Sequence, residues 1–369
     1  MTTMVLTGPA LTGMAPTVTV VIPSRDRPWQ LREALQSVLD QSLDQVEVIV
    51  VDDGSMAQYA AAYRDIEEQA PSHVRFIHLA HTPRGHGSSF ARNVGAAAAT
   101  GTHLTFLDDD DALTDMSYLE RAMAALAASG PVDLHLSDQL AFAAGVKVER
   151  KIWIEDLRDR LGDAPPADAT GAHVVTPAML LACVGFAHLN TTVVSRTLFD
   201  AIGGFDECQR YEADRDFYLR AIDHAGIIKY SPFYVARHNV PDPRLAVNVS
   251  TIVSRTNRAV FQLRLLNKAV LFSTRPEIGA YARRHHAYVL RRIAEALYAE
   301  RNFPIARYYA WSALASRFTL KWLGFCVLAT TRSLLPMSLL PMGPARAQPA
   351  SAPYMAMSDV LRTAPAVPS

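Results

Sequence analysis

Short apolar runs alternate with helical patterns over residues 17–111, and this alternation limits the possible folds more than any other feature. The runs rich in β-branched residues, each predicted to be a strand, are 17–27, 46–55, 74–80 and 102–111. Helices are predicted between them, starting at Pro28 and covering 56–70 and 87–101, the last closed by Gly101. Strands and helices alternating at this spacing form right-handed βαβ units. The sequence therefore predicts an α/β fold with a mainly parallel sheet flanked by helices.

The rest of the chain divides into a mixed part and an all-helical part. A helix at 211–226 and a strand at 227–238 close the mixed part, and residues 250–338 carry a continuous helical pattern. The end of the chain is rich in Pro and Ala, which is typical of disorder. We expect four segments: a flexible tail at 1–16, an α/β domain at 17–245, a helical region at 246–340 and a disordered tail at 341–369.

Charge and cysteine content exclude several classes of protein. The chain has 36 basic and 36 acidic residues, so it lacks the basic excess of a general nucleic-acid binder, and nucleic acid is not an expected partner. Its three cysteines are far apart, which argues against a disulfide framework or zinc site and fits a reducing cytoplasm. No signal peptide is evident, and the most apolar stretch, 323–342, is interrupted by Arg332 and two prolines. We expect a cytoplasmic protein.

Four consecutive aspartates, Asp108 to Asp111, form the strongest chemical signal. Adjacent carboxylates repel each other unless a cation neutralises them. In an extended chain Asp108 and Asp110 would lie on one side, where they could hold Mg²⁺ or Mn²⁺ beside a phosphate. The alternative is that these acids cap the following helix. We favour the metal site because ligands bind at the carboxyl ends of strands in such sheets.

Other polar clusters also follow predicted strands, and each has an ordinary alternative. One carboxylate of Asp52 and Asp53 could accept a hydrogen bond from a base imide or a ribose hydroxyl, or the pair could belong to a simple Asp-Gly turn. Arg92 follows the glycines of 85–87 and could pair with a phosphate or lie on a helix surface. No GxGxxG or P-loop pattern is present, which disfavours a nicotinamide enzyme or a P-loop NTPase.

A later acid cluster and one histidine are candidates for catalysis or metal binding. One acid in the segment Glu212 to Asp216 could be a general base, although acids are also favoured in a first helical turn. His238 could ligate a metal or be structural. The other eleven histidines are expected to be structural.

These clusters, in this order, resemble the family 2 glycosyltransferases, which have the GT-A fold. The resemblance covers about residues 17–245, with the rest of the chain outside it. Its motifs are VVIPSRDR (20–27), VVDDGS (50–55), ARNVGAAAATG (91–101), FLDDDD (106–111), IGGFDE (202–207) and ADRDFYLR (213–220).

The resemblance implies a role for each candidate residue. Ser24 and Asp53 would contact the nucleotide base, Arg92 would lie near the nucleotide, and Asp108 would lie by the ribose. The residues implied on the donor-nucleotide side are Pro23, Ser24, Arg25, Asp53, Arg92, Asp108 and Asp109. Asp110 and His238 would hold the metal, Asp214 or Glu212 would be the base, and Gly204, Phe205 and Asp206 would shape the acceptor side.

The sequence departs from the family pattern at two places in the site. Arg25 stands where an aromatic residue is common and Asp26 where Asn is common, which leaves the base of the donor open. The usual Glu-Asp pair reads Ala213-Asp214, with Glu212 one residue early, so either Asp214 or Glu212 has the role of base.

The resulting prediction is a metal-dependent, inverting glycosyltransferase. It would move a sugar from a nucleotide-diphosphate donor to the hydroxyl of a glycan, lipid-linked or small-molecule acceptor, with Mn²⁺ or Mg²⁺ as cofactor. The alternative is a non-catalytic nucleotide-sugar or carbohydrate-binding protein on the same fold. A sugar-nucleotide nucleotidyltransferase is disfavoured, because residues 24–27 lack the glycine-rich loop that it needs.

The helical region would form a dimer, hold the acceptor, or lie peripherally on the inner face of the membrane. Arg283, Arg284, Arg291 and Arg292 would suit an anionic surface, although a solvated helix face is the favoured interpretation.

Overall fold

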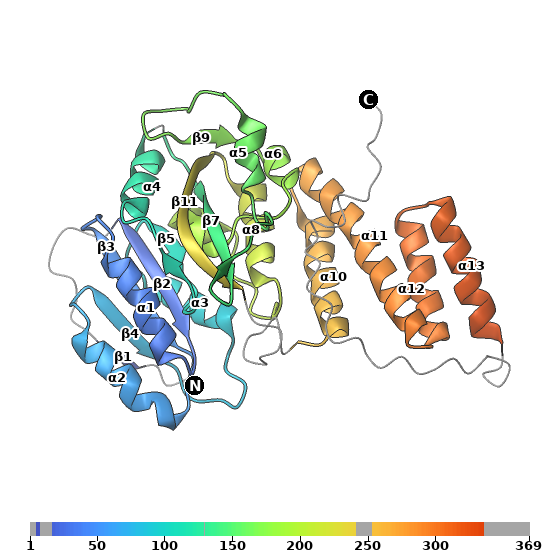
Figure 1. Ribbon diagram of the computed structural model, residues 1–369, viewed down its shortest axis with the longest axis horizontal. Coiled ribbons are helices and arrows are strands. Elements are labelled where there is room, and N and C mark those ends of the chain that lie inside the picture. The colour runs from blue at the N-terminus through green and yellow to red at the C-terminus, as the bar shows by residue number, and fades with distance from the viewer. Residues whose placement is uncertain (1–4, 8–16, 129, 241–252, 336–369) are drawn as a thin grey trace. The chain divides into compact units, whose positions relative to one another are not determined.

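The computed structural model of the protein describes residues 5–7, 17–128, 130–240 and 253–335 (Figure 1). The chain divides into two compact units with a boundary between Asp242 and Pro243. The first unit contains a sheet flanked by helices, and the second unit is helical in its described part.

A mixed sheet of eleven strands runs through the described part of the first unit, in the order β1-β4-β3-β2-β5-β10-β7-β11-β6, with β8 beside β7 and β9 beside β11. The strands are β1 (Val5–Thr7), β2 (Val18–Ser24), β3 (Val46–Asp52), β4 (Val74–His78), β5 (His103–Phe106), β6 (Ala112–Leu113), β7 (Leu134–Ala143), β8 (Val146–Lys147), β9 (His173–Val175), β10 (Thr192–Ser195) and β11 (Ile228–Val240). The parallel arrangement predicted for the first four apolar runs is confirmed in β4-β3-β2-β5. Beyond β5 the sheet is mixed, because β10 lies antiparallel to both β5 and β7.

Helices cover both faces of this sheet. They are α1 (Pro28–Leu39), α2 (Ala60–Gln69), α3 (Ser88–Ala98), α4 (Tyr118–Ala127), α5 (Asp156–Leu161), α6 (Pro177–Leu181), α7 (Arg196–Ala201) and α8 (Ala213–His224), with single turns η1 (Ala57–Tyr59) and η2 (Leu189–Thr191). Alternate residues of β3 point to opposite faces: Val48 and Val50 join the core with α1, α2 and α4, while Val51 faces α3. A Cβ at Gly95 of α3 would lie 2.4 Å from Val21 Cγ1, so glycine allows this helix to pack closely on the sheet.

The structure corrects two expectations about segment ends. Val5–Thr7, expected in a flexible tail, pairs antiparallel with β4, because the outer edge of β4 offers backbone groups to a further strand. Residues 1–4 and 8–16, and the predicted disordered tail at 341–369, lie outside the described residues. The helix expected to close at Gly101 ends at Ala98; Gly101 instead lies against β2, where a Cβ would come 2.7 Å from Thr19 Oγ1.

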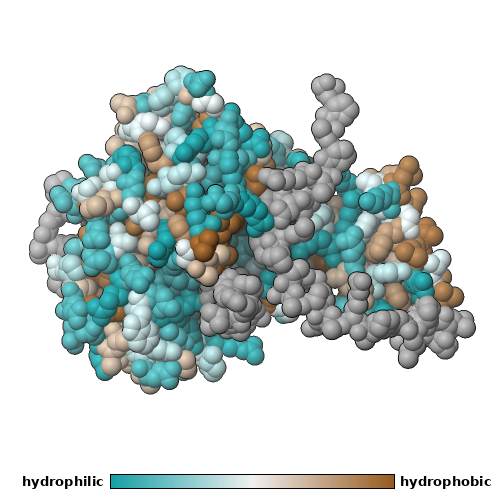
Figure 2. All heavy atoms as spheres, viewed as in Figure 1, coloured by the Kyte–Doolittle hydropathy of each residue, from teal (hydrophilic) through white to brown (hydrophobic). Residues whose placement is uncertain are grey.

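The second unit consists of α10 (Arg255–Phe272), α11 (Pro276–Ala299), α12 (Phe303–Ser316) and α13 (Leu320–Leu334) in its described part. Leu290 and Ala294 of α11 pack with Ala310 of α12 and Cys326 of α13 in a core of their own. Apolar side chains also gather on the outside of α12 and α13 (Figure 2). Among the described residues, every helix is too short or too polar to span a bilayer.

Candidate active site

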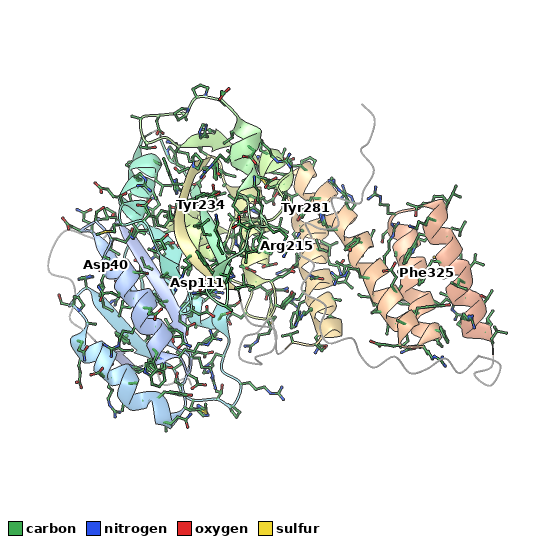
Figure 3. The ribbon with its side chains drawn as sticks, in the orientation of Figure 1. Asp40, Asp111, Arg215, Tyr234, Tyr281 and Phe325 are labelled. Carbon is green, nitrogen blue, oxygen red and sulfur yellow. The ribbon has the colours of Figure 1, made fainter. Side chains whose placement is uncertain are left out.

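The four aspartates lie in a turn at the carboxyl end of β5, which ends at Phe106. The Asp111 N–H donates to the Asp108 carbonyl oxygen at 3.1 Å, which closes this turn of residues 108–111, called the acid turn below. The extended alternation expected for Asp108 and Asp110 is therefore wrong. The four carboxylates point in different directions, and only Asp109 and Asp110 share a partner. Asp111 lies near the middle of the first unit (Figure 3).

Asp108 is paired with Arg92 of α3. Burial alone would raise the pKa of Asp108, but the charge and hydrogen bond of Arg92 outweigh it and hold the pKa at about 2. The buried Arg92 guanidinium also lies 5.4 Å from the centre of the Phe205 ring. Within the described part of the chain, Arg92 Nε has no hydrogen-bond acceptor. It is therefore available to an anionic ligand.

Asp109 and Asp110 share one counter-ion, Arg27. Arg27 Nη1 lies 3.2 Å from Asp109 Oδ1 and 3.0 Å from Asp110 Oδ2. Burial, with repulsion from Asp110, raises the pKa of Asp109 to about 7. Burial, with repulsion from Asp111, raises the pKa of Asp110 to about 6. One arginine therefore leaves negative charge in this turn only partly compensated.

Asp111 is buried and connects the turn to β11 and η2. Its carboxylate accepts from Asn190 Nδ2 at 2.6 Å and from the Asn239 N–H at 2.7 Å, and it lies 2.8 Å from His238 Nδ1. Burial alone would lower the pKa of His238, but the Asp111 charge raises it to about 9. Possible ligand atoms of Asp111, His188 and His238 lie within 4.8 Å of one another. This group contains Asp111 in place of the Asp110 expected from the sequence, because Asp110 turns toward Arg27.

His188 lies between Asp108 and the candidate base Asp214. Its Nε2 is 3.9 Å from Asp108 Oδ2 and 3.9 Å from Asp214 Oδ2. Burial and the nearby His238 lower the pKa of His188 to about 4, and its Nδ1 accepts from the Asn190 N–H. The ring is therefore neutral near pH 7, with its Nε2–H toward the two carboxylates.

The two candidate bases lie at the start of α8 in different settings. Asp214 Oδ1 accepts from the Arg215 N–H at 2.8 Å, its side chain is 24% exposed, and burial raises its pKa. Glu212 has a left-handed backbone with φ of 54°. Its Oε2 lies 3.5 Å from Arg215 Nη1, and its side chain is only 8% exposed. His188 thus lies between Asp214 and Asp108, 3.9 Å from each, whereas Glu212 is paired with Arg215.

Asp53 and Arg25, both predicted on the donor-nucleotide side, hold the loop at 82–87. Asp53 accepts from the His86 and Gly87 N–H groups, each at 2.8 Å, and Arg25 donates to the carbonyl oxygens of Asp53 and Thr82. Gly85 has a φ of 64°, and a Cβ there would come 2.6 Å from Asp53 Oδ2.

Ser24 and Pro23 lie buried at the end of β2. Ser24 Oγ is 2.7 Å from the hydroxyl of Tyr63. These side chains therefore shape the sheet edge and its loop in addition to any contact with a ligand.

The segment predicted on the acceptor side is held against the core. Phe205 is 3% exposed, and its ring stacks on that of Phe217 with the ring centres 4.6 Å apart. Asn93 holds the Phe205 backbone, accepting its N–H and donating to its carbonyl oxygen, each at 2.9 Å. A Cβ at Gly204 would come 2.7 Å from Asn93 Oδ1. Asp206 Oδ1 accepts the Cys208 N–H.

Sequence reasoning missed three residues of the site. His188 was expected to be structural, and Arg27 and Asn190 received no role. No local pattern marks His188 or Asn190, which come together with the acid turn only when β10 is inserted beside β5. Arg27 could have been found as a basic residue three positions after the end of β2, the strand that pairs with β5.

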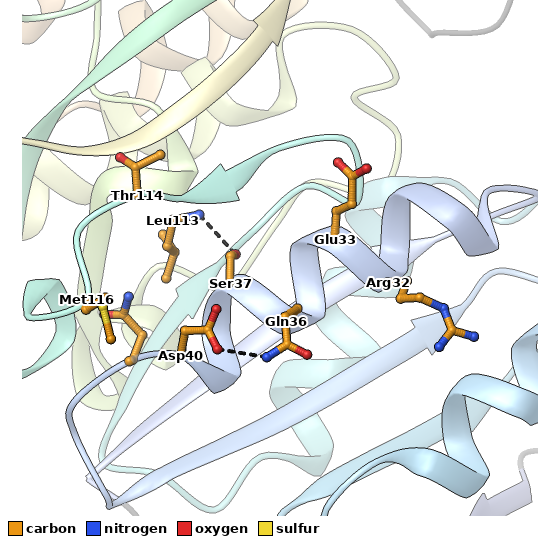
Figure 4. Close-up of a pocket in the computed structure, with 9 residues that line it drawn as sticks. Arg32, Glu33, Gln36, Ser37, Asp40, Leu113, Thr114 and Met116 are labelled. Atoms are coloured by element: carbon orange, nitrogen blue, oxygen red, sulfur yellow. Dashed lines mark hydrogen bonds between the residues drawn. The ribbon is translucent and has the colours of Figure 1, made fainter.

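A hollow of about 570 Å³ lies elsewhere, between α1 and residues 113–116 (Figure 4). Arg32, Glu33 and Asp40 line it, and Gln36 donates to Asp40 across its floor at 2.7 Å. None of the candidate residues of the acid turn lines this hollow, so it is separate from the candidate site.

Part of the chain resembles a known family in sequence. The family model described as glycosyl transferase family 2 matches residues 19–145. An uncharacterized glycosyltransferase of Nostoc sp. is 37% identical over 94 residues, which are 26% of this chain and 28% of the relative. The chain covers between 26% and 42% of the length of the curated relatives that it matches.

Solved structures share the fold at low sequence identity. S. aureus TarS in complex with UDP-GlcNAc has a TM-score of 0.55 and 19% identity, covering 85% of this chain and 79% of that one. The mannosyltransferase PcManGT from Pyrobaculum calidifontis, in complex with GDP-Man and Mn²⁺, has a TM-score of 0.52 and 20% identity, covering 87% and 81%. The fold is therefore GT-A, as the sequence predicted.

Proposed function

Because residues 19–145 form a glycosyl transferase family 2 domain, we propose that the protein is a metal-dependent, inverting glycosyltransferase. It takes a sugar from a nucleotide-diphosphate donor and transfers it to an acceptor hydroxyl of a glycan, a glycolipid or a small molecule. We assign this activity to residues 17–245 and keep residues 246–340 as a helical accessory region.

One observation carries the proposal: His188 lies between a carboxylate of the acid turn and a carboxylate of α8 and is close to both. Asp108 and Asp214 are 106 positions apart in the sequence, yet each has an oxygen 3.9 Å from the same imidazole nitrogen. A glycosyl transfer needs a group that binds the donor next to a group that takes the proton of the acceptor. Asp108 with Arg92 supplies the first, and Asp214 supplies the second.

The acid turn fits a divalent cation. The raised pKa values of Asp109 and Asp110 reflect buried negative charge that Arg27 compensates only in part. We keep Asp110 and His238 as the proposed ligands: without a ligand Asp110 pairs with Arg27, and Asp111 would orient the His238 ring through Nδ1. A bound ion would stabilise the negative charge that develops on the leaving group.

Relatives of known structure support a nucleotide-sugar donor. TarS is described with UDP-GlcNAc and PcManGT with GDP-Man and Mn²⁺. In this chain Arg92 has a buried Nε–H without an acceptor among the described residues, and a diphosphate oxygen would satisfy it. Ser24, Arg25 and Asp53 would position the base through the loop at 82–87.

Asp214 is the proposed general base. Its pKa is raised by burial, which makes it a stronger base than a solvated carboxylate. It would remove the acceptor proton as the hydroxyl oxygen attacks the anomeric carbon from the face opposite the leaving group. The neutral His188 would orient Asp214 and Asp108 relative to each other.

A thermal-shift panel tests the proposal, using UDP-, GDP-, dTDP- and CDP-sugars, each with and without Mn²⁺. A ligand that binds the folded state raises the midpoint by mass action. We expect one nucleotide to raise it only with metal, and Asp110→Ala to abolish that shift and the turnover of the donor.

The outcomes separate the two candidate functions. A metal-dependent shift together with release of nucleoside diphosphate supports the enzyme. A shift without any turnover would favour the non-catalytic binding protein. No shift with any donor would contradict the donor site itself.

A further inference from the structure

The described part of the second unit has a large excess of basic over acidic residues. Residues 253–335 contain 14 lysines and arginines and 3 acids, whereas the whole chain has 36 of each charge. The remainder is therefore strongly acidic. A helical unit with this excess of positive charge attracts anionic surfaces.

The outward side of α12 carries no charged residue. Phe303, Ala306, Ala310 and Ala313 face the core of the unit. On the opposite side, Pro304, Ile305, Tyr308, Trp311 and Ala315 are exposed, and Tyr308 is 67% exposed. Their spacing of three and four positions aligns them along one stripe.

The outward side of α13 continues this apolar surface. Trp322, Cys326 and Ala329 are buried, while Leu320, Gly324, Val327, Leu328 and Leu334 are exposed, with Leu320 at 78%. Trp311 Nε1 donates to Thr330 Oγ1 at 2.9 Å, so the two stripes lie side by side. Phe318, in the link between the helices, is also exposed. We call this surface the α12–α13 face.

Basic side chains lie next to the face. Arg317 and Lys321 are exposed on either side of Phe318 and Leu320, and Arg307 and Arg332 are partly exposed along the helices. An apolar stripe with aromatic residues and a basic border is typical of helices that lie in the interface of an anionic bilayer. Every described helix falls short of a span, so such contact would be shallow.

We propose that the α12–α13 face docks the protein on an anionic phospholipid surface. Tyr308, Trp311, Leu320 and Val327 enter the headgroup region, and Arg317 and Lys321 bind lipid phosphates. Charge complementarity favours this occupant over the same face of a second copy, because two copies of this basic unit would repel each other. The location differs from the α11 arginines suggested by the sequence. It does not depend on the proposed enzymatic activity.

Sedimentation of the full chain with vesicles tests the proposal. Vesicles of phosphatidylglycerol mixed with phosphatidylcholine are compared with vesicles of phosphatidylcholine alone. We expect binding to the anionic vesicles only, weakened when NaCl is raised to about 0.5 M. Tyr308→Asp/Val327→Asp should reduce the partition coefficient by about tenfold or more.

Met116→Asp/Val146→Asp is the matched control. It adds the same charge at two exposed apolar residues of the first unit, with Val146 at 70% exposure, and should bind like wild type. Circular dichroism checks that all variants fold.

Three results would overturn the proposal. Wild type could stay in the supernatant, or the double variant could pellet as well as wild type. Alternatively, wild type could be an oligomer that Tyr308→Asp/Val327→Asp converts to a monomer with unchanged vesicle binding, which would show that a second copy covers the face. If residues 336–369 cover it, only a chain ending at residue 335 would pellet, and docking by the full chain would be excluded.

Discussion

Arg27 illustrates how a single residue makes the acid turn compatible with a folded protein. It lies 3.2 Å from Asp109 and 3.0 Å from Asp110, whose like charges would otherwise face each other in a buried turn. Arg92 does the same for Asp108, and His238 does so for Asp111. The four aspartates thus have three different cationic partners, each from a different element, and this divides one sequence motif into separate roles.

Replacement of Asp214 separates its chemical role from binding. Asp214→Asn keeps the size of the side chain but cannot accept a proton, so turnover should fall by about 10²-fold or more, with the donor-induced thermal shift near that of wild type. Initial rates of nucleoside diphosphate release measure the change. Glu212→Gln is the matched control and should retain most turnover, because Glu212 is paired with Arg215. Full turnover in Asp214→Asn would transfer the role of base to Glu212.

Asp138 of β7 gives the stability of the protein a distinct pH dependence. Burial raises the pKa of Asp138 to about 7, although the Tyr230 hydroxyl and Arg158 oppose the shift. In the unfolded chain this pKa is about 3.9. Between these values the folded state holds a proton that the unfolded state has lost, so stability falls as pH rises from about 4 to 7.

Asp138→Asn should remove this contribution. Urea unfolding at pH 4.5 and pH 8 should show a smaller loss of stability in the variant than in wild type. Asp163→Asn, at an exposed acid, should behave like wild type. An equal loss in Asp138→Asn and wild type would show that Asp138 is not protonated in the folded protein.

At the scale of elements, α3 shows how closely a helix approaches the sheet beneath the site. A Cβ at Gly95 would lie 2.4 Å from Val21 Cγ1, whereas one at Gly324 of α13 would meet nothing within 4 Å. Gly95→Ala should therefore destabilise the protein by about 1–3 kcal/mol through overpacking. Gly324→Ala should stabilise it by about 0.5–1 kcal/mol, because alanine loses less backbone entropy in a helix. Urea unfolding measures both, and stabilisation by Gly95→Ala would contradict the close packing of α3.

Local patterns predicted the elements well where burial is complete. All seven residues of β2 and of β3 are buried, and runs of this kind are typical of the central strands of a parallel sheet. The pairing of β10 between β5 and β7 had no such signal, since its neighbours in the sheet are distant in the sequence. Antiparallel insertion of a short strand depends on tertiary packing rather than on residue pattern.

The same distinction explains which site residues were found. Asp108, Asp110, Asp214 and His238 stand out in sequence because they follow strands or open a helix. His188 does not, because its importance comes from two carboxylates 80 and 26 positions away. The turn at Asp108–Asp111 also changed the direction of each carboxylate, which strand periodicity alone could not predict.

For the whole molecule, two cores imply two unfolding transitions. The sheet unit and the helical unit each have a separate hydrophobic cluster. Scanning calorimetry should resolve two transitions, and the donor with Mn²⁺ should raise only that of the sheet unit, because the candidate site lies there. Leu290→Ala, in the helical core, should lower only the other transition. A single transition that responds to both changes would show that the cores unfold together.

The link between Asp111 and β11 determines when the site can form during protein synthesis. Asp111 bonds His238 and Asn239, which are translated 127 and 128 positions later. At the usual rate of elongation this delay is roughly 6 to 25 s. Arg27 and Arg92 precede the acid turn, so two of its three cationic partners are already present in the nascent chain. The growing polypeptide therefore carries an acid turn whose charge is only partly compensated, and the site is complete only after β11 has left the ribosome.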